Sequence, residues 1–119
     1  MTVTTETVMH YEKSGVAFTI SAPPVKVAVS GTAFTRIIQN IATSEEQLDF
    51  GDVTTPGMVY FRNLDSTNFV EIRPGIGVAD LVRLNAGEDC RFRFAATATA
   101  PYAIADTAAV DLEMCLIED

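Results

Sequence analysis

Residues 57–75, GMVYFRNLDSTNFVEIRPG, decide the fold of this chain. Two runs of β-forming residues, Met58–Arg62 and Asn68–Arg73, flank a loop of turn formers, and this pattern is typical of an antiparallel hairpin. Side chains alternate between the two faces of a strand, so one face of the expected hairpin is aliphatic. We expect that face to lie in the core, with Phe61 opposite Val70 or Ile72. Its members are Val59, Phe61, Val70 and Ile72.

The opposite face of the expected hairpin has a mixed composition. It combines aromatic, methionine and charged side chains: Met58, Tyr60, Arg62, Phe69, Glu71 and Arg73. Aromatic residues, Met and Arg are enriched at the centres of protein interfaces, whereas the solvated face of an acidic protein would be richer in Asp, Glu, Lys and Thr. We therefore expect this set to be a protein-interaction surface. The alternative is that the hairpin lies within the sandwich and Phe69 packs beneath a loop.

The length and charge of the chain limit what it can bind. Its 119 residues suffice for one domain, which would bury roughly two-thirds of the unfolded surface. The formal net charge is −8 and the pI is about 4.4, so nucleic acid and anionic membranes would repel it. Yet 48% of the residues are hydrophobic and the mean hydropathy is +0.21. This content indicates either a well-filled core with many alanines or apolar surface that a partner covers.

Short alternating segments continue along the rest of the chain. The expected strands are Thr2–Tyr11, Val16–Ala22, Val25–Ser30, Thr32–Thr43, Ala79–Leu84, Cys90–Ala96 and Ala108–Ile117. Pro23-Pro24 is expected to end the second of these strands, because proline cannot donate to a β-ladder. The segment Thr32–Thr43 fits helical as well as strand spacing, and its β-branched content favours a strand.

Eight or nine short strands with turn signals between them, and no long helix, predict an all-β fold. We expect a single compact β-sandwich, with a jelly-roll-like topology preferred and an immunoglobulin-like one second. Residues 1–14 are expected to form an N-terminal edge strand or arm, and residues 15–119 the single β-sandwich domain.

Groups that carry chemistry are scarce. His10 is the only histidine and the two cysteines are far apart in sequence, which is too few of the usual ligands for a zinc site. Phosphate-loop, dinucleotide and serine-nucleophile motifs are absent from the sequence. Asp49 with Asp52, or Asp65 near Glu71, could form a glycosidase pair, but Asp65 is expected in a turn, where its side chain accepts backbone N–H bonds. Asp49 and Asp52 could bind calcium weakly, although their spacing is not that of an EF-hand loop. We expect no enzymatic activity, no cofactor and no metal.

The ends of the chain and its cysteines bear on location. The start, MTVTTETVMHYE, lacks the basic and apolar regions of a signal peptide, and no apolar run is long enough to cross a bilayer. Cys90 shares its phase with Phe92 and Phe94 and is expected to be buried. Cys115 falls on the polar side of the last strand. A disulfide between the two is possible, although a reducing cytoplasm argues against it.

The central pattern resembles a recurring signature of small virion proteins of tailed bacteriophages. It consists of a glycine, a short apolar strand, Asn63-Leu64-Asp65 and Thr67-Asn68-Phe69-Val70. It continues with the segment 84–88, LNAGE, an arginine-containing strand and the closing residues 110–113, VDLE, so that the resemblance covers about residues 41–119.

This resemblance implies a capsid decoration (cement) or other head-associated protein, made in the host cytoplasm and placed on the capsid exterior. It would bind the major capsid protein, form a homo-oligomer on the particle and stabilise the shell, without contacts to nucleic acid or membrane. The alternative is a tail-associated or carbohydrate-binding sandwich. Sugar-binding sandwiches usually stack sugars on exposed aromatic rings, and this chain has no Trp and three Tyr.

Overall fold

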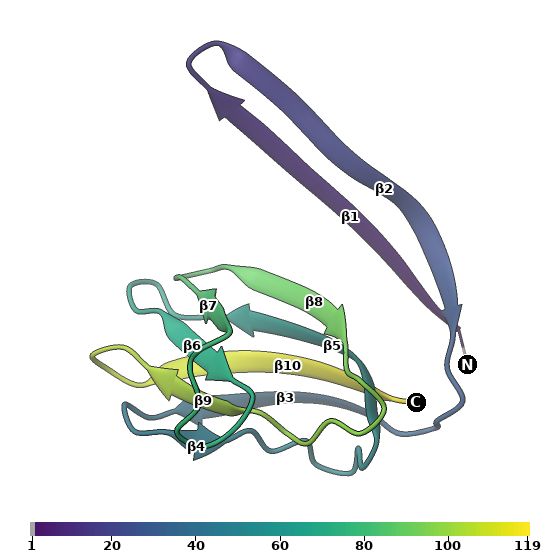
Figure 1. Ribbon diagram of the computed structural model, residues 1–119, viewed down its shortest axis with the longest axis vertical. Helices are drawn as coiled ribbons and strands as arrows, with labels where there is room; N and C mark the ends of the chain where they lie inside the picture. Colours follow the sequence, from purple (N-terminus) through teal and green to yellow (C-terminus); the bar gives the residue numbers. More distant parts are fainter. Residues whose placement is uncertain (1) are drawn as a thin grey trace. The chain divides into compact units, whose positions relative to one another are not determined.

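The computed structural model describes residues 2–119, which form ten strands and no helix. The chain divides into two units, Met1–Ser30 and Gly31–Asp119. The second unit is a β-sandwich and the first is a long hairpin, here called the arm (Figure 1). The predicted all-β class is therefore confirmed.

Two four-stranded sheets make up the sandwich (Figure 1). The first sheet contains, in spatial order, β3 (Phe34–Ile41), β10 (Val110–Glu118), β5 (Pro56–Asn63) and β8 (Asp89–Arg93). The second sheet contains β4 (Glu46–Gln47), β9 (Tyr102–Ala105), β6 (Val70–Arg73) and β7 (Val82–Leu84). Every pair of neighbouring strands is antiparallel.

The strand order of the sandwich is that of a jelly roll. Counted from β3 as the first strand, the sheets run 1-8-3-6 and 2-7-4-5. Only β6 and β7 are both consecutive in the chain and paired with each other, and every other connection passes from one sheet to the other. Eight antiparallel strands in two Greek keys define this topology. The preferred prediction is thus confirmed over the immunoglobulin-like one.

The core lies between the two sheets and follows the predicted alternation of side chains. Phe61 and Val70 are completely buried, and Val59 and Ile72 are nearly so. The closing strand β10 contributes Leu112, Met114 and Leu116 from the same face, and β3 ends in the buried Ile41. The segment 32–43, ambiguous by its spacing, is a strand over most of its length.

The predicted hairpin of residues 57–75 is wrong, because its two runs lie in different sheets. β5 pairs with β8 and β10, whereas β6 pairs with β7 and β9. The buried Asn63 folds the intervening loop: its Nδ2 donates to the carbonyls of Asn68 (2.8 Å) and Leu84 (3.0 Å). Its Oδ1 accepts from Asp65 N at 2.8 Å. These hydrogen bonds stabilise a loop that crosses from one sheet to the other. Val59 and Phe61 therefore face Val70 and Ile72 across the core instead of lying beside them on one sheet face.

The arm consists of β1 (Thr2–Lys13) and β2 (Val16–Ala28), paired antiparallel along their length. Ser14 and Gly15 join them, with φ of 51° and 79°. Positive φ at both central positions is the signature of a type I′ turn, the favoured two-residue hairpin connection.

The boundary between the units therefore lies after Ser30, not after residue 14 as the sequence suggested. The reason is that Val16–Ala28 pairs with Thr2–Lys13 and with no strand of the sandwich. Gly31 already packs tightly within the sandwich unit: a Cβ there would lie 2.5 Å from the Glu118 carbonyl oxygen. The predicted N-terminal arm exists, but it has two strands instead of one.

Pro23-Pro24 does not end the strand as predicted. The pairing of β1 with β2 continues on both sides, with Thr7 opposite Ala22 and Thr5 opposite Val25. Glu6 of β1 is therefore the one residue opposite the two prolines of β2, and the extra residue in β2 makes this site a β-bulge. A bulge leaves a residue outside the ladder, so it accommodates residues that lack an N–H.

Candidate functional site

The arm has one apolar face along its whole length. Cross-strand partners share a face, and the bulge at Pro23-Pro24 shifts the phase of β2 so that Val25 and Val27 join the same side as Ile20. We call this side the apolar arm face. It consists of Val3, Thr5, Thr7, Met9 and Tyr11 from β1 and Val16, Phe18, Ile20, Ala22, Val25 and Val27 from β2, with Lys13 opposite Val16 as its one charged member.

The large side chains of the apolar arm face are exposed. Met9 is 64% exposed, Ile20 55% and Phe18 52%. The opposite face is mostly polar, and there His10 Nδ1 and Thr19 Oγ1 lie 2.8 Å apart. A two-stranded hairpin is at best marginally stable in water without something packed on its apolar side. The composition of the arm thus indicates a surface for another molecule.

A second candidate surface is the outward side of the first sheet, here called the outer sheet face. Phe61 points into the core, so its neighbours along β5 point outward, and the register extends this side across all four strands. The apolar and sulfur-containing members are Phe34, Ile38, Met58, Tyr60, Cys115 and Ile117. The charged members are Arg36, Arg62, Asp89, Arg91, Arg93, Asp111 and Glu113.

The outer sheet face differs in charge from the rest of the sandwich. The arm carries two lysines and two glutamates, so the net charge of −8 lies on residues 31–119. Four of the six arginines of the sandwich lie on the strands of the outer sheet face, together with three acidic residues of the same strands. Arg36 pairs with Glu113, which raises the pKa of the guanidinium, and Arg93 pairs with Asp119 at 2.6 Å. With Asp119 counted beside Arg93, four arginines meet four acids, so this face is close to neutral on a strongly acidic unit.

The middle of the outer sheet face is partly desolvated. Tyr60 and Cys115 are cross-strand neighbours on β5 and β10, and both are half-buried. Burial, and secondarily Asp89, raises the pKa of Tyr60. Burial, and secondarily Glu113, raises the pKa of the Cys115 thiol. Side chains that are already half covered lose little further hydration when a partner docks on them.

The six residues predicted to form one surface are divided between the two sides of the sandwich. Met58, Tyr60 and Arg62 belong to the outer sheet face, whereas Glu71 and Arg73 project from β6 on the other sheet. They cannot share a face, because β5 and β6 lie on opposite sides of the core. Phe69 precedes β6 and is half-buried, with the Arg83 guanidinium 3.9 Å from its ring centroid. The proposed single interface of these six residues is therefore wrong as a set.

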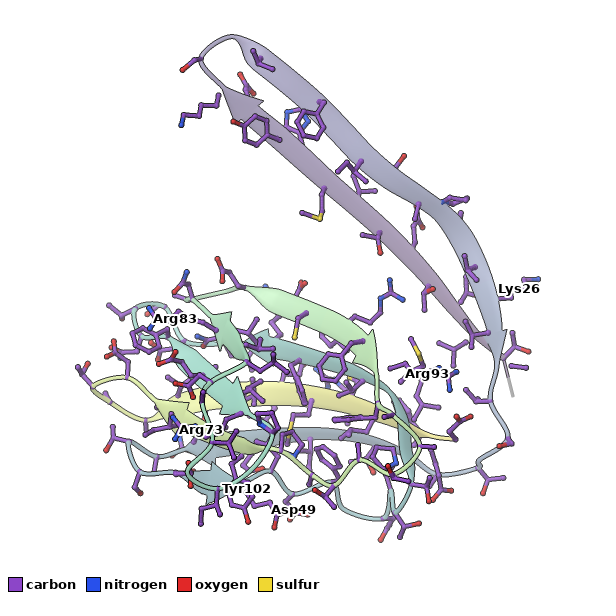
Figure 2. All side chains as sticks on the ribbon, viewed as in Figure 1. Lys26, Asp49, Arg73, Arg83, Arg93 and Tyr102 are labelled. Carbon is purple, nitrogen blue, oxygen red and sulfur yellow. The ribbon has the colours of Figure 1, made fainter. Side chains whose placement is uncertain are left out.

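Ion pairs engage Arg73, Glu71 and Arg83 on the second sheet, where Figure 2 labels the two arginines. Arg73 lies 2.6 Å from Glu45 and 2.7 Å from Asp80, and the hydrogen bond to Glu45 is the main reason that the pKa of Arg73 is raised. Glu71 lies 3.3 Å from Arg83. Arg73 thus ties two loops to β6 and Arg83 ties β7 to β6, so we assign both arginines to the structure of the sandwich.

An apolar pocket of about 390 Å³ opens on the sandwich. Its apolar lining includes Ile72, Pro74, Leu81, Val82, Phe92 and Phe94. Arg73 and Arg93 also line it. Phe92 and Phe94 stack edge to face with centroids 5.0 Å apart. Pockets of this size and composition bind apolar groups rather than small polar substrates.

The carboxylates and thiols considered from the sequence have local roles. Asp49 accepts a hydrogen bond from Gly51 N at 2.9 Å, and Asp65 accepts from the amides of Thr67 and Asn68, which lowers its pKa. Cys90 points inward and Cys115 outward, and both thiols are free. Within residues 2–119, no three His, Cys, Asp or Glu side chains are grouped so that they could hold a metal ion. In the same range no helix could span a membrane.

Sequence reasoning missed the apolar arm face and the contributions of β3, β8 and β10 to the outer sheet face. A signal for the arm was present: Ser14-Gly15 separates two alternating runs, which favours a two-residue hairpin. No comparable signal exists for the outer sheet face, because it depends on which strands become neighbours. No family model, curated protein or solved structure matches this chain.

Proposed function

We propose that this protein is a structural protein of a tailed-bacteriophage virion that decorates the capsid exterior, binds the major capsid protein and stabilises the shell. The observation that carries the proposal is the arm, a ribbon with an exposed apolar face that serves no purpose within a solvated monomer. The resemblance of residues 41–119 to small virion proteins supports the same class.

The outer sheet face is the surface that we assign to the capsid protein. It presents the half-buried Tyr60 near its centre with arginines around it, residue types that are enriched in the core of interfaces, whereas Met58 on the same side is buried, with 9% of its surface exposed. Because positive and negative side chains balance on this face, it would let an acidic decoration protein approach a shell with less repulsion than the rest of the sandwich would. Jelly rolls occur in capsid proteins and in lectins alike, so the fold by itself does not separate the two.

The carbohydrate-binding alternative has less support from the side chains. Tyr60 and Tyr102 are half-buried, and Tyr11, at 46%, is the most exposed tyrosine. Sugar sites use aromatic rings that lie open to the ligand. An arm made of alternating aliphatic residues fits a protein partner better.

Binding of the purified protein to undecorated capsids tests the assignment of the outer sheet face. Ile38 is 55% exposed at the edge of this face, so Ile38→Asp should leave the fold intact. Placing an unpaired carboxylate in a desolvated contact should lower capsid affinity at least tenfold. Val8→Asp is the matched control, since Val8 is 62% exposed on the polar face of the arm and the substitution adds the same charge outside the outer sheet face.

Equal affinity of Ile38→Asp, Val8→Asp and the parent would exclude the outer sheet face from the contact. Failure of the parent itself to bind capsids would contradict the proposed function.

A further inference from the structure

We propose that two copies of this chain exchange their arms, and that the aromatic tip of each arm, Tyr11 with Phe18, seats in the apolar pocket of the other copy. The inference goes beyond the proposed function, because it does not depend on which protein covers the outer sheet face. It states what fills the pocket and which surface the apolar arm face contacts.

The tip of the arm carries an exposed pair of aromatic side chains. Tyr11 and Phe18 are cross-strand partners one step from the Lys13–Val16 pair that closes the hairpin, with ring centroids 5.2 Å apart. They are 46% and 52% exposed, and Val16 beside them is 61% exposed. Phe18 lies ten residues before the end of β2, so the ribbon carries the rings about 33 Å from its root. Aromatic pairs of this kind supply much of the energy of protein interfaces.

The pocket matches the tip in size and character. A cavity of about 150 Å³ accepts one benzene ring, so the pocket volume of about 390 Å³ has room for two rings. Leu81 of the β6–β7 loop lines the pocket and is 76% exposed. Ile76 and Val78 of the same loop are 72% and 47% exposed, so this loop offers further apolar surface to the arm.

Charge favours a contact between an arm and a sandwich over one between two sandwiches. The sandwich carries the whole net charge of −8, so two sandwiches repel each other, whereas the arm is neutral and holds both lysines of the chain, Lys13 and Lys26. The two arginines of the pocket lining are already paired, Arg73 with Glu45 and Asp80 and Arg93 with Asp119. The match between the arm tip and the pocket is therefore one of size and apolar character, and net charge bears only on which units associate.

The area of the arm requires that the exchange be reciprocal. One face of a two-stranded ribbon eleven residues long covers roughly 350 Å². A single seated arm would then bury about 700 Å² over both partners, which is below the range of specific interfaces. Two arms exchanged between the same two copies bury about 1,400 Å², within that range. The contact is thus expected in a two-fold dimer, in which each copy gives an arm and receives one.

Sedimentation of the full chain and three variants tests the exchange. The parent should be a dimer, and Phe18→Asp and Leu81→Asp should each be a folded monomer by sedimentation and circular dichroism, since both side chains are exposed. Val8→Asp should stay a dimer, because Val8 is 62% exposed on the polar face of the same arm. A monomeric parent, or a dimeric Phe18→Asp variant, would overturn the proposal.

Disulfide trapping then identifies the contact, with Cys115→Ser in every chain to remove the outward thiol. A mixture of Phe18→Cys and Leu81→Cys chains should oxidise to a covalent dimer that contains one chain of each. Phe18→Cys chains that link to one another would show that arm packs on arm. A chain with both substitutions that closes on itself, with no dimer from the mixture, would show that the arm occupies its own pocket. Either result, or no trapping at all, overturns the exchange.

Discussion

At the scale of single residues, the loop after β5 depends on Asn63 and Asp65. The Asn63 amide is completely buried and satisfies two carbonyls and one amide, while the Asp65 carboxylate accepts from Thr67 N at 2.9 Å and from Asn68 N. Buried backbone groups that lose such partners are costly, so this pair fixes the crossover between the sheets. The charge on Asp65 makes part of this stabilisation depend on pH.

The pKa of Asp65 lies below its ordinary value because two backbone amides, of Asn68 and then Thr67, donate to the carboxylate. A carboxylate whose pKa is lower in the folded state stabilises the fold above its unfolded pKa of about 3.9, and loses this effect as the pH falls through the folded value. Asp65→Asn should therefore lower the Tm at pH 7. The deficit relative to the parent should shrink as the pH falls below about 4, as measured by calorimetry. A deficit that is constant over this range would show that the charge of Asp65 contributes nothing.

The two thiols differ in environment and should differ in reactivity. Burial raises the pKa of Cys90 to about 11, so only about one thiol in a thousand is ionised at pH 8. Cys115 faces outward, and its pKa is also raised, but Arg36 partly offsets the effects of burial and Glu113. Iodoacetamide at pH 8 should thus alkylate Cys115 well before Cys90, as followed by peptide mass spectrometry. Equal rates in the folded protein, with equal rates after denaturation as the control, would contradict the inward placement of Cys90.

At the scale of elements, the arm and the sandwich differ in what stabilises them. The sandwich has a contiguous core of buried residues, whereas no residue between Thr2 and Ala28 is buried. Each element of the sandwich can bury its apolar side against the other sheet, and the arm has no second layer of its own. This contrast explains why one unit carries the fold and the other is suited to a partner.

A chain cut to residues 31–119 should therefore fold by itself. We expect a cooperative thermal transition and a β-type circular dichroism spectrum, because the core residues all lie within this range. The peptide of residues 1–30 should be largely unstructured alone, since a hairpin without a covering layer is marginal. Loss of the cooperative transition in the shorter chain would show that the sandwich needs the arm. A stably folded peptide would contradict the view of the arm as a dependent element.

The elements also show what could be predicted from sequence. The inward side of each strand was predictable, because alternation is a local property: Val59, Phe61, Val70 and Ile72 are all in the core. Strand partners were not, because they depend on where the connecting loop leads. The hydrogen bonds of Asn63 fold the loop so that Met58–Arg62 and Asn68–Arg73 lie in different sheets. For the same reason only Met58, Tyr60 and Arg62 of the predicted interaction surface lie on the outer sheet face. The other three predicted members, Phe69, Glu71 and Arg73, belong to the side of the second sheet.

At the scale of the whole molecule, charge and apolar surface are separated. Residues 31–119 carry the net charge of −8, and the neutral arm carries the longest exposed apolar face. A strongly acidic unit stays soluble by repulsion, while a neutral ribbon can associate. The outer sheet face adds a second surface, close to neutral in charge, on the sandwich. These two surfaces fit a protein that contacts both its own copies and a shell, which is what a decoration protein must do.

The most direct measurement of the proposed function is quantitative mass spectrometry of purified virions of the phage that we propose as the source of this chain, before and after capsids are separated from tails. We expect the protein in the capsid fraction, in a copy number that is a large and fixed fraction of that of the major capsid protein. Its absence from virions, or its presence only in the tail fraction at a few copies per particle, would contradict the proposal that it decorates the shell.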